Sequence, residues 1–185
     1  MAMPVVVPRY TLQDLESFPD DGNRYELVDG LLLVTPGPAP PHEVVVSELF
    51  GRLDAYLRPD QIARVFTRGT IEVAPKHHLE PDLLVVPTDA LAGALGLEAR
   101  WTDIQRWWLA VEVSGRESTV YDRDVKGPAY LALGIREYWR VDLREQSAFV
   151  RRPGDPAEQR QAERLIWHPP GREAPLVIPI PDLFA

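Results

Sequence analysis

The sequence predicts an α/β protein in which helices flank a mixed β-sheet. Short apolar runs at Leu83 to Val86 and Trp107 to Val113 are typical of strands covered on both faces. From His42 to Leu57, apolar residues recur three and four positions apart, which indicates a helix with one buried stripe. A second helical segment lies between strand-like segments, as in a crossover connection. These observations favour a sheet with helices on both sides.

Composition limits the classes of protein that need considering. The 185 residues suit a single domain, which we expect to span residues 1–185. The absence of cysteine excludes disulfides, thiolate catalysis and cysteine-ligated zinc. No apolar run approaches the roughly 20 residues of a membrane span, and the N-terminus lacks the features of a signal peptide, so we expect a cytoplasmic protein.

The charge balance is acidic, with a formal net charge of −8. This argues against a general nucleic-acid coat, which usually presents a basic face. It does not exclude a nuclease, because acids clustered at a metal site are compensated once the metal binds.

The N-terminal third begins with a short helix and a hairpin. Thr11 can cap a helix that continues to Phe18. Residues 24–34 form two short strand patterns joined at Asp29-Gly30, a strong hairpin signal. A proline-rich connection then leads to the long helix at 42–57, which Pro59 ends.

The remaining elements follow from shorter patterns. We expect strands at 63–67 and 70–73 with a turn near Arg68-Gly69, a short helix at 89–97 and a polar loop at 100–106. Ser118 or Thr119 can cap a helix that ends at Gly134. After it we expect strands at 137–142 and 148–152, a charged loop or short helix at 151–164, and edge strands at 165–168 and 176–180, which prolines flank.

Two acidic residues lie at the edges of the apolar runs. Asp82 precedes the first run and Glu112 lies within the second. A carboxylate in a buried strand is costly unless it is paired or binds a metal. Lys126 follows, and it is one of only two lysines, the other being Lys76, in a chain with eighteen arginines. Two acids and a lysine suggest the site of a divalent-metal hydrolase.

The order of these residues resembles a known family. The chain is similar to the Uma-type family, a domain of unknown function whose members are proposed endonucleases of the PD-(D/E)xK superfamily. The resemblance covers roughly residues 10–152 and is carried by Pro81-Asp82, Glu112-Val113-Ser114, Asp122-Arg123-Asp124 with Lys126, and Gly134 to Trp139.

The resemblance implies a fold, an activity and a set of roles. The fold would be a restriction-endonuclease-like core with an N-terminal hairpin extension. Asp82, Glu112 and the backbone carbonyl of Val113 would hold Mg²⁺ or Mn²⁺, which prefer oxygen ligands. Lys126 would orient the attacking water or stabilise charge on the phosphate. The substrate would be DNA, and a homodimer would suit cleavage of both strands.

One departure from the superfamily pattern concerns the lysine. It usually lies two residues after the second acid, where this chain has Ser114. Lys126 must instead reach the site from the following helix. Because Pro128 would clash inside a continuous helix, either the helix is kinked or it begins near Gly127-Pro128 and leaves Lys126 on a loop.

Several site residues have a structural alternative. Asp82 can cap or turn the chain before its strand, Glu112 can pair with Arg116 or Arg123, and Lys126 can be a solvated surface residue. Two further residues are candidate supporting groups. Glu26 either points into the site or faces outward beside Arg24, and His42 is either a base, a phosphate contact or a structural histidine. His77 and His78 form a poor chelate in an expected loop, because adjacent extended residues point in opposite directions.

Three functions therefore remain open. The first is a metal-dependent DNA endonuclease. The second is a nuclease fold without activity that binds DNA or another protein, which the acidic charge and the absence of a DNA-reading motif favour. The third is a metal hydrolase acting on a small phosphorylated molecule, which substrate competition would separate from the first.

Overall fold

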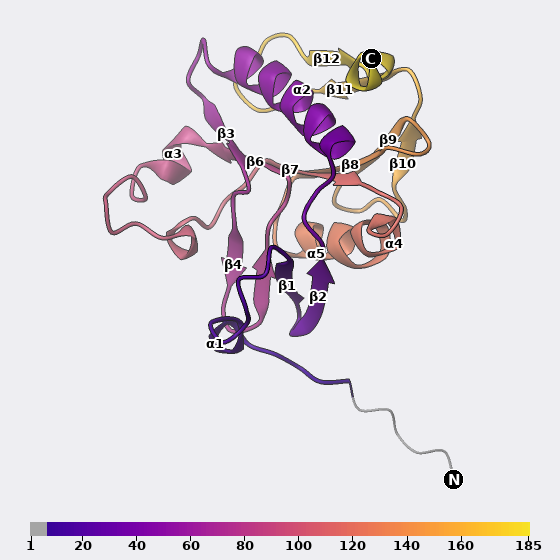
Figure 1. The fold of residues 1–185 in the computed structure, drawn as a ribbon. Coiled ribbons are helices and arrows are strands. Elements are labelled where there is room, and N and C mark those ends of the chain that lie inside the picture. Colours follow the sequence, from indigo (N-terminus) through magenta and orange to yellow (C-terminus); the bar gives the residue numbers. More distant parts are fainter. Residues whose placement is uncertain (1–6) are drawn as a thin grey trace.

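The central element is a six-stranded mixed sheet, seen in a computed structural model that describes residues 7–185 (Figure 1). The strand order is β10-β9-β8-β7-β6-β3; β7 and β8 are parallel, and every other neighbouring pair is antiparallel. The strands are β3 (Ala63–Thr67), β6 (Leu83–Pro87), β7 (Leu109–Ser114), β8 (Glu137–Asp142), β9 (Ser147–Arg151) and β10 (Gln159–Gln161). This sheet carries the mixed α/β fold that the sequence predicts.

Helix α2 (Pro40–Leu57) covers one face of the sheet. Its two N-terminal prolines suit the first turn, where a helix has no backbone partner for their missing N–H groups. The helix ends before Pro59, as predicted. The hairpin of β11 (Arg164–Trp167) and β12 (Leu176–Pro179), followed by the 3-10 helix η3 (Ile180–Phe184), packs into the same core.

The opposite face is covered by shorter helices. Strand alternation separates the two cores, since Ala110 of β7 lies in the second core while Leu109 and Val111 lie in the first. The elements on this side include α3 (Thr88–Leu91), the 3-10 helix η1 (Trp101–Asp103), α4 (Thr119–Tyr121), the π-helix η2 (Asp122–Lys126) and α5 (Gly127–Ala132).

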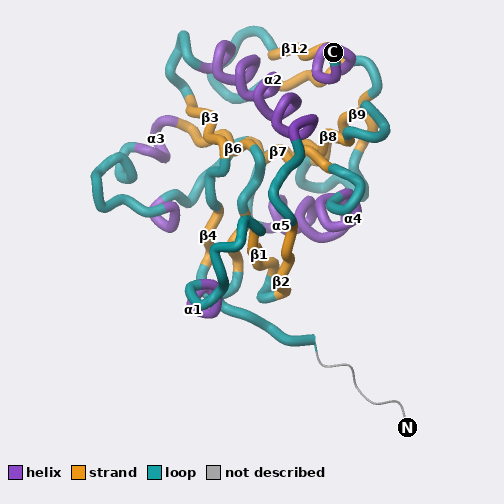
Figure 2. Tube along the Cα trace, in the orientation of Figure 1, coloured by secondary structure: helices purple, strands orange, loops and turns teal. Residues whose placement is uncertain are grey.

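A second sheet forms the lower lobe in Figures 1 and 2. Its order is β2-β1-β5-β4, with α1 (Leu12–Leu15) beside it. The strands are β1 (Arg24–Val28), β2 (Leu31–Thr35), β4 (Ile71–Val73) and β5 (His77–Leu79). The β1–β2 hairpin turns at Asp29 and Gly30, both with positive φ, as the Asp-Gly signal predicts.

Three predicted elements need correction, whereas the strands predicted at 63–67 and 70–73 and the turn between them are confirmed. Because β3 pairs with β6 while β4 pairs with β5, this turn at Arg68 (φ 56°) passes the chain from one sheet to the other. His77 and His78 lie in β5 rather than in a loop. The helix predicted at 89–97 is confined to Thr88–Leu91, and residues 151–164 include strand β10.

The segment 119–132 is helical, but its hydrogen bonding changes along its length. Pro128 lies in the first turn of α5, as one of the two alternatives proposed. Lys126, however, lies in the π-helix η2 and not on a loop. A π-helical turn is one way for a helical chain to accommodate a residue that lacks an N–H donor.

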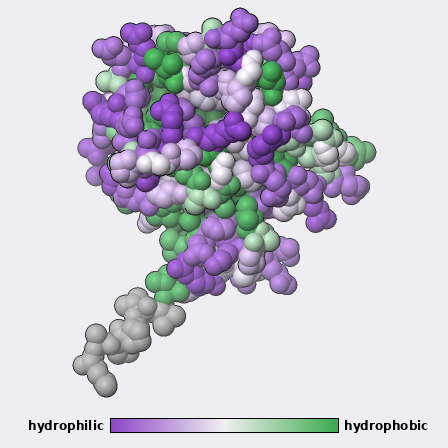
Figure 3. All heavy atoms as spheres, turned by 180° about the vertical axis from the view of Figure 1, so that it is seen from behind, coloured by the Kyte–Doolittle hydropathy of each residue, from purple (hydrophilic) through white to green (hydrophobic). Residues whose placement is uncertain are grey.

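Hydrophilic residues dominate the rear face, and hydrophobic ones gather toward its lower part (Figure 3). No helix within residues 7–185 combines the length and apolar character needed to cross a bilayer.

Candidate active site

Asp82 lies directly before β6, and its carboxylate has three partners. Oδ1 accepts a hydrogen bond from Arg24 Nη1 at 2.8 Å, and Oδ2 lies 2.9 Å from His42 Nε2. Oδ2 also accepts the backbone N–H of Val113 at 2.8 Å. Strand β1, helix α2 and strand β7 therefore meet at this one side chain, which is 2% exposed.

Glu112 projects from the middle of β7 into the core beneath α5. Its neighbours Val111 and Val113 point to the other core, as strand alternation requires. Glu112 Oε1 accepts a hydrogen bond from Tyr130 Oη at 2.6 Å and another from Lys126 Nζ at 3.2 Å. Glu112 therefore faces the helical segment that carries Lys126.

Lys126 is enclosed by acids. Its Nζ lies 2.5 Å from Glu26 Oε2, 3.2 Å from Glu112 Oε1 and 3.6 Å from Asp122 Oδ1. Asp122 and Lys126 are four residues apart on one helical face, and Glu26 reaches the same point from β1. One ammonium thus serves three buried carboxylates.

Ser114 contributes to this cluster indirectly. It lies two residues beyond Glu112 on β7, so both side chains project from the same face of the strand. Its hydroxyl donates to Asp122 Oδ2 at 2.8 Å. Ser114 therefore occupies the position where the superfamily usually has its lysine, and from there it binds Asp122.

The pKa values of the two central acids move in opposite directions. Burial disfavours the ionised form of Asp82, but the hydrogen bond and charge of His42, with the charge of Arg24, outweigh it and lower the Asp82 pKa to about 2. For Glu112, burial raises the pKa well above its ordinary value; Lys126 opposes this rise, whereas Asp82, Asp122 and Glu26 add to it. The Glu112 carboxylate therefore lacks sufficient positive charge nearby.

Lys126 remains charged despite its burial. Burial alone would lower the pKa of its ammonium, but Glu112, Glu26 and Asp122 reverse the effect and raise that pKa above its ordinary value. With all three acids ionised, the group around Lys126 would carry two uncompensated negative charges. A proton or an additional cation relieves this excess.

Comparison with known proteins adds a family to this geometry. The sequence model of Uma2, described as "Putative restriction endonuclease", matches residues 12–183. The chain belongs to the Uma2 family. No curated protein sequence matches it.

A solved structure confirms the restriction-endonuclease-like fold. It is titled "Crystal structure of a putative nuclease belonging to DUF820 from Anabaena variabilis ATCC 29413 at 1.96 A resolution". It superposes with a TM-score of 0.72 at 21% sequence identity, over 94% of this chain and 97% of the other. Membership of Uma2, with this fold, indicates a nuclease, that is, a hydrolase of phosphodiester bonds.

The oxygen donors predicted for this site are of the kind that a hard divalent cation prefers. Because the Val113 N–H points from β7 toward Asp82, its carbonyl faces the same edge of the strand. Two carboxylates and one carbonyl offer oxygen ligands, and Mg²⁺ typically takes one or two carboxylates and completes its shell with water. Within residues 7–185, no three His, Asp or Glu side chains converge as a ready-made metal centre.

A cavity of about 250 Å³ opens beside Asp82. Its walls include Arg24, Arg68 and Thr67, together with residues of α2. It offers a space next to the buried carboxylate with two guanidinium groups at its border.

The structure distinguishes among the alternatives for the predicted residues. Glu26 points inward, since it is fully buried and contacts Lys126. Lys126 is buried rather than solvated.

Glu112 pairs with Lys126 rather than with Arg116 or Arg123. His42 hydrogen bonds to Asp82, which makes it a neighbour of the central acid.

Three residues that contact Asp82, Glu112 or Lys126 were not predicted as site residues. Arg24 was considered only as a partner of Glu26, but it binds Asp82. Asp122 and Tyr130 lie four residues before and after Lys126, a spacing that places them on its helical face. That spacing was the signal available in the sequence. Pro128 obscured it, because a continuous helix through residues 122–130 could not be assumed.

Proposed function

We propose that this Uma2 protein is an endonuclease that hydrolyses DNA phosphodiester bonds with Mg²⁺ or Mn²⁺. The observation that supports this proposal is that strand β7 links the three predicted residues. The Val113 N–H of β7 binds Asp82, the adjacent Glu112 binds Lys126, and Asp82 borders a cavity. Catalysis needs such groups to be held near one another.

Each residue has a distinct part in this proposal. Asp82, Glu112 and the Val113 carbonyl hold the cation, which when bound polarises the scissile phosphate and acidifies a water molecule. Asp82 is suited to this because its low pKa keeps it ionised. Lys126 keeps its proton and presents it to the attacking water or to the charge developing on the phosphate.

Three neighbours position these groups. His42 and Arg24 fix the two oxygens of Asp82, so its carboxylate cannot rotate freely. Tyr130 donates to Glu112 and restrains it in the same way. Such support is what keeps a ligand set near its working geometry.

A second candidate is a nuclease fold that binds DNA or a protein without cutting. One observation favours it: both oxygens of Asp82 and the ammonium of Lys126 already have partners within the chain. In that case, the cluster would hold the fold together and a divalent ion would not alter its stability.

Cleavage of plasmid DNA tests the proposal. The purified protein should nick or cut the plasmid with Mg²⁺ or Mn²⁺ and be inactive in EDTA, and Asp82→Asn should be inactive in all three conditions. Asp124→Asn is the matched control, because Asp124 is exposed and its one ion pair in the described part of the chain is with its neighbour Arg123. If the wild type leaves several DNA forms intact with either ion, the second candidate replaces the first.

A further inference from the structure

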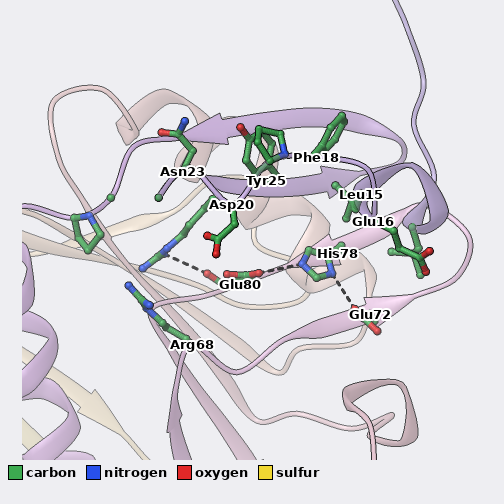
Figure 4. A pocket seen from close by; sticks show the side chains of 16 residues that line it. Leu15, Glu16, Phe18, Asp20, Asn23, Tyr25, Arg68, Glu72, His78 and Glu80 are labelled. Atoms are coloured by element: carbon green, nitrogen blue, oxygen red, sulfur yellow. Dashed lines mark hydrogen bonds and ion pairs between the residues drawn. The ribbon is translucent and has the colours of Figure 1, made fainter.

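A cavity of about 710 Å³ lies on the lower lobe, next to the candidate active site (Figure 4). This is within the usual range of about 300–1,000 Å³ for ligand pockets. Its walls come from the first turn region of α1, the loop before β1, and strands β4 and β5. Glu80 in its wall is only two residues from Asp82, so an occupant would lie close to the proposed chemistry.

Two arginines form the border between this cavity and the smaller one beside Asp82. Arg24 and Arg68 line both. Arg24 is committed to Asp82, but Arg68 is exposed and forms no ion pair with any residue in the range 7–185. Figure 4 shows the Arg68 side chain without an interaction to the other lining residues. An unpaired guanidinium has donors in a fork that fits a phosphate.

Acidic side chains line the same cavity and begin beside the arginines, since the Glu80 carbonyl lies 3.5 Å from Arg24 Nη1. Glu72 and Glu80 are held 3.0 Å from the two ring nitrogens of His78, and Asp20, which has no hydrogen bond or ion pair within residues 7–185, lies beside Glu80 (Figure 4). Carboxylates are acceptors for the amino groups at the edges of nucleic-acid bases. These acids therefore suit a base, whereas they would repel a phosphate.

An aromatic pair completes the lining. Phe18 and Tyr25 both face the cavity, with ring centroids 5.1 Å apart. Aromatic side chains provide stacking surfaces for unpaired bases and tolerate different sequences. A phosphate-binding end, an acceptor end and a stacking surface are the three parts that a nucleotide site needs.

We propose that this cavity binds one unpaired nucleotide of the DNA strand adjacent to the scissile phosphate. Its phosphate binds Arg68 at the border with the active site, and its base enters between the aromatic pair and the acids. The base must be unpaired, because in a duplex the amino groups of its pairing edge are already engaged. This inference rests on the proposed nuclease function and adds a preference for single-stranded or locally unpaired DNA.

Fluorescence anisotropy with Ca²⁺ in place of Mg²⁺ tests the phosphate end. The probe is a labelled single-stranded oligonucleotide of about twelve nucleotides, within the usual site sizes. Arg68→Ala should weaken its binding about tenfold. Arg64→Ala is the matched control, since it removes the same charge from an exposed position of β3 outside both cavities, and it should change binding by less than about threefold.

A cavity-filling variant tests the base end. Asp20→Trp places a large ring in the cavity and removes a negative charge. Electrostatics alone would strengthen DNA binding, so weaker binding of the single strand, with unchanged binding of a fully paired duplex, would report blockage of the cavity. Glu98→Trp makes the same chemical change on an exposed loop away from the cavity and should leave both affinities nearly unchanged.

The outcomes separate this proposal from the proposed function. Equal effects of Arg68→Ala and Arg64→Ala, no loss with Asp20→Trp, or no binding of the single strand by the wild type would each overturn the nucleotide site. If the wild type still cleaves plasmid DNA with Mg²⁺ in those cases, the nuclease proposal stands. If the binding results are as expected but no cleavage occurs with either ion, the nucleotide site stands and the nuclease proposal fails.

Discussion

Glu112 and Arg140 are register partners on the parallel strands β7 and β8, and both are 2% exposed. Arg140 is fully engaged. Its Nη1 donates to Asp142 Oδ2 at 2.8 Å, its Nε and Nη2 donate to the two carboxylate oxygens of Glu158, and its guanidinium lies 4.0 Å from the centre of the Phe149 ring. Every nitrogen of this guanidinium therefore donates to a carboxylate.

The group around Glu112 differs in its charge balance. Glu112, Glu26 and Asp122 share the single ammonium of Lys126. Burial raises the pKa of Glu112 instead of being offset by a dedicated partner. Buried polar groups that only hold a fold are usually satisfied, and a strongly perturbed acid in a cluster of ionisable groups is a candidate functional group. The contrast between the two regions is the physical basis for placing function at Glu112 and structure at Arg140.

Replacement of Lys126 should have the largest effect on activity. Lys126→Ala should reduce cleavage by about a thousandfold, because the water or phosphate loses its positive partner. Lys126→Arg should also be poor, since a planar guanidinium does not replace a compact ammonium. Plasmid cleavage rates would measure both.

The other lysine of the chain is the matched control. Lys76→Ala should cleave normally, because Lys76 is exposed and, within residues 7–185, pairs only with Asp29. A fully active Lys126→Arg variant would mean that position 126 supplies only diffuse charge. Lys126→Ala should also lower metal-free stability, since three buried acids would lose their cation.

Replacement of Arg140 should lower stability and leave cleavage largely intact, the reverse of what we expect mainly for Lys126. Arg140→Met leaves Asp142 and Glu158 without their partner, so the free energy of unfolding should fall by about 3–5 kcal/mol. The cleavage rate per folded molecule should change little. Urea unfolding gives the first quantity, and activity corrected for the folded fraction gives the second. A stable but inactive Arg140→Met protein would remove the distinction between the two regions.

His78 should provide a pH-dependent effect of about 1.5–3 kcal/mol. Burial alone would lower its pKa, but hydrogen bonds and charge from Glu80 and Glu72 raise it above the ordinary value. A raised folded-state pKa gives stability that is complete below the unfolded pKa, about 6.5, and is lost as pH rises through the folded value.

Melting curves of His78→Asn across pH would measure this effect. The variant should be less stable than the wild type below about pH 6.5, and the difference should shrink at alkaline pH. His77→Asn is the control, because within residues 7–185 the His77 ring hydrogen bonds only with the backbone N–H of Asp29. A difference that does not vary with pH would mean that the His78 ring is held as a neutral hydrogen-bonding group.

Local patterns in the sequence predicted the elements that depend on local chemistry. The hairpin at Asp29-Gly30, helix α2 and strand β7 with its inward Glu112 all follow from turn type and hydrophobic period. The pairing of β3 with β6 instead of β4 could not be derived in this way, because non-local packing decides it. Strand β5 is too short to give a pattern.

The residues of the candidate site likewise fall into two groups, those that local sequence patterns indicate and those that non-local packing decides. Asp82, Glu112 and Lys126 could be selected because charged residues are unusual beside apolar runs and because lysine is rare in this chain. The inward direction of Glu26 and the contact between Arg24 and Asp82 depend on how the lower lobe packs against the main sheet. No sequence period reports such a contact between two sheets.

The most direct test of the central claim is the effect of Mn²⁺ on thermal stability. An ion that binds only the folded state stabilises it by RT ln(1 + [L]/Kd), or about 1.4 kcal/mol at tenfold excess over Kd. Calorimetric melts should therefore show a saturable rise for the wild type. Asp82→Asn and Glu112→Gln should each reduce it, with non-additive effects because they share one ligand. Asp142→Asn, in the Arg140 network, should be less stable but keep the full rise. The account predicts that the Asp82→Asn/Glu112→Gln double variant loses the response, and an undiminished rise in that variant would contradict it.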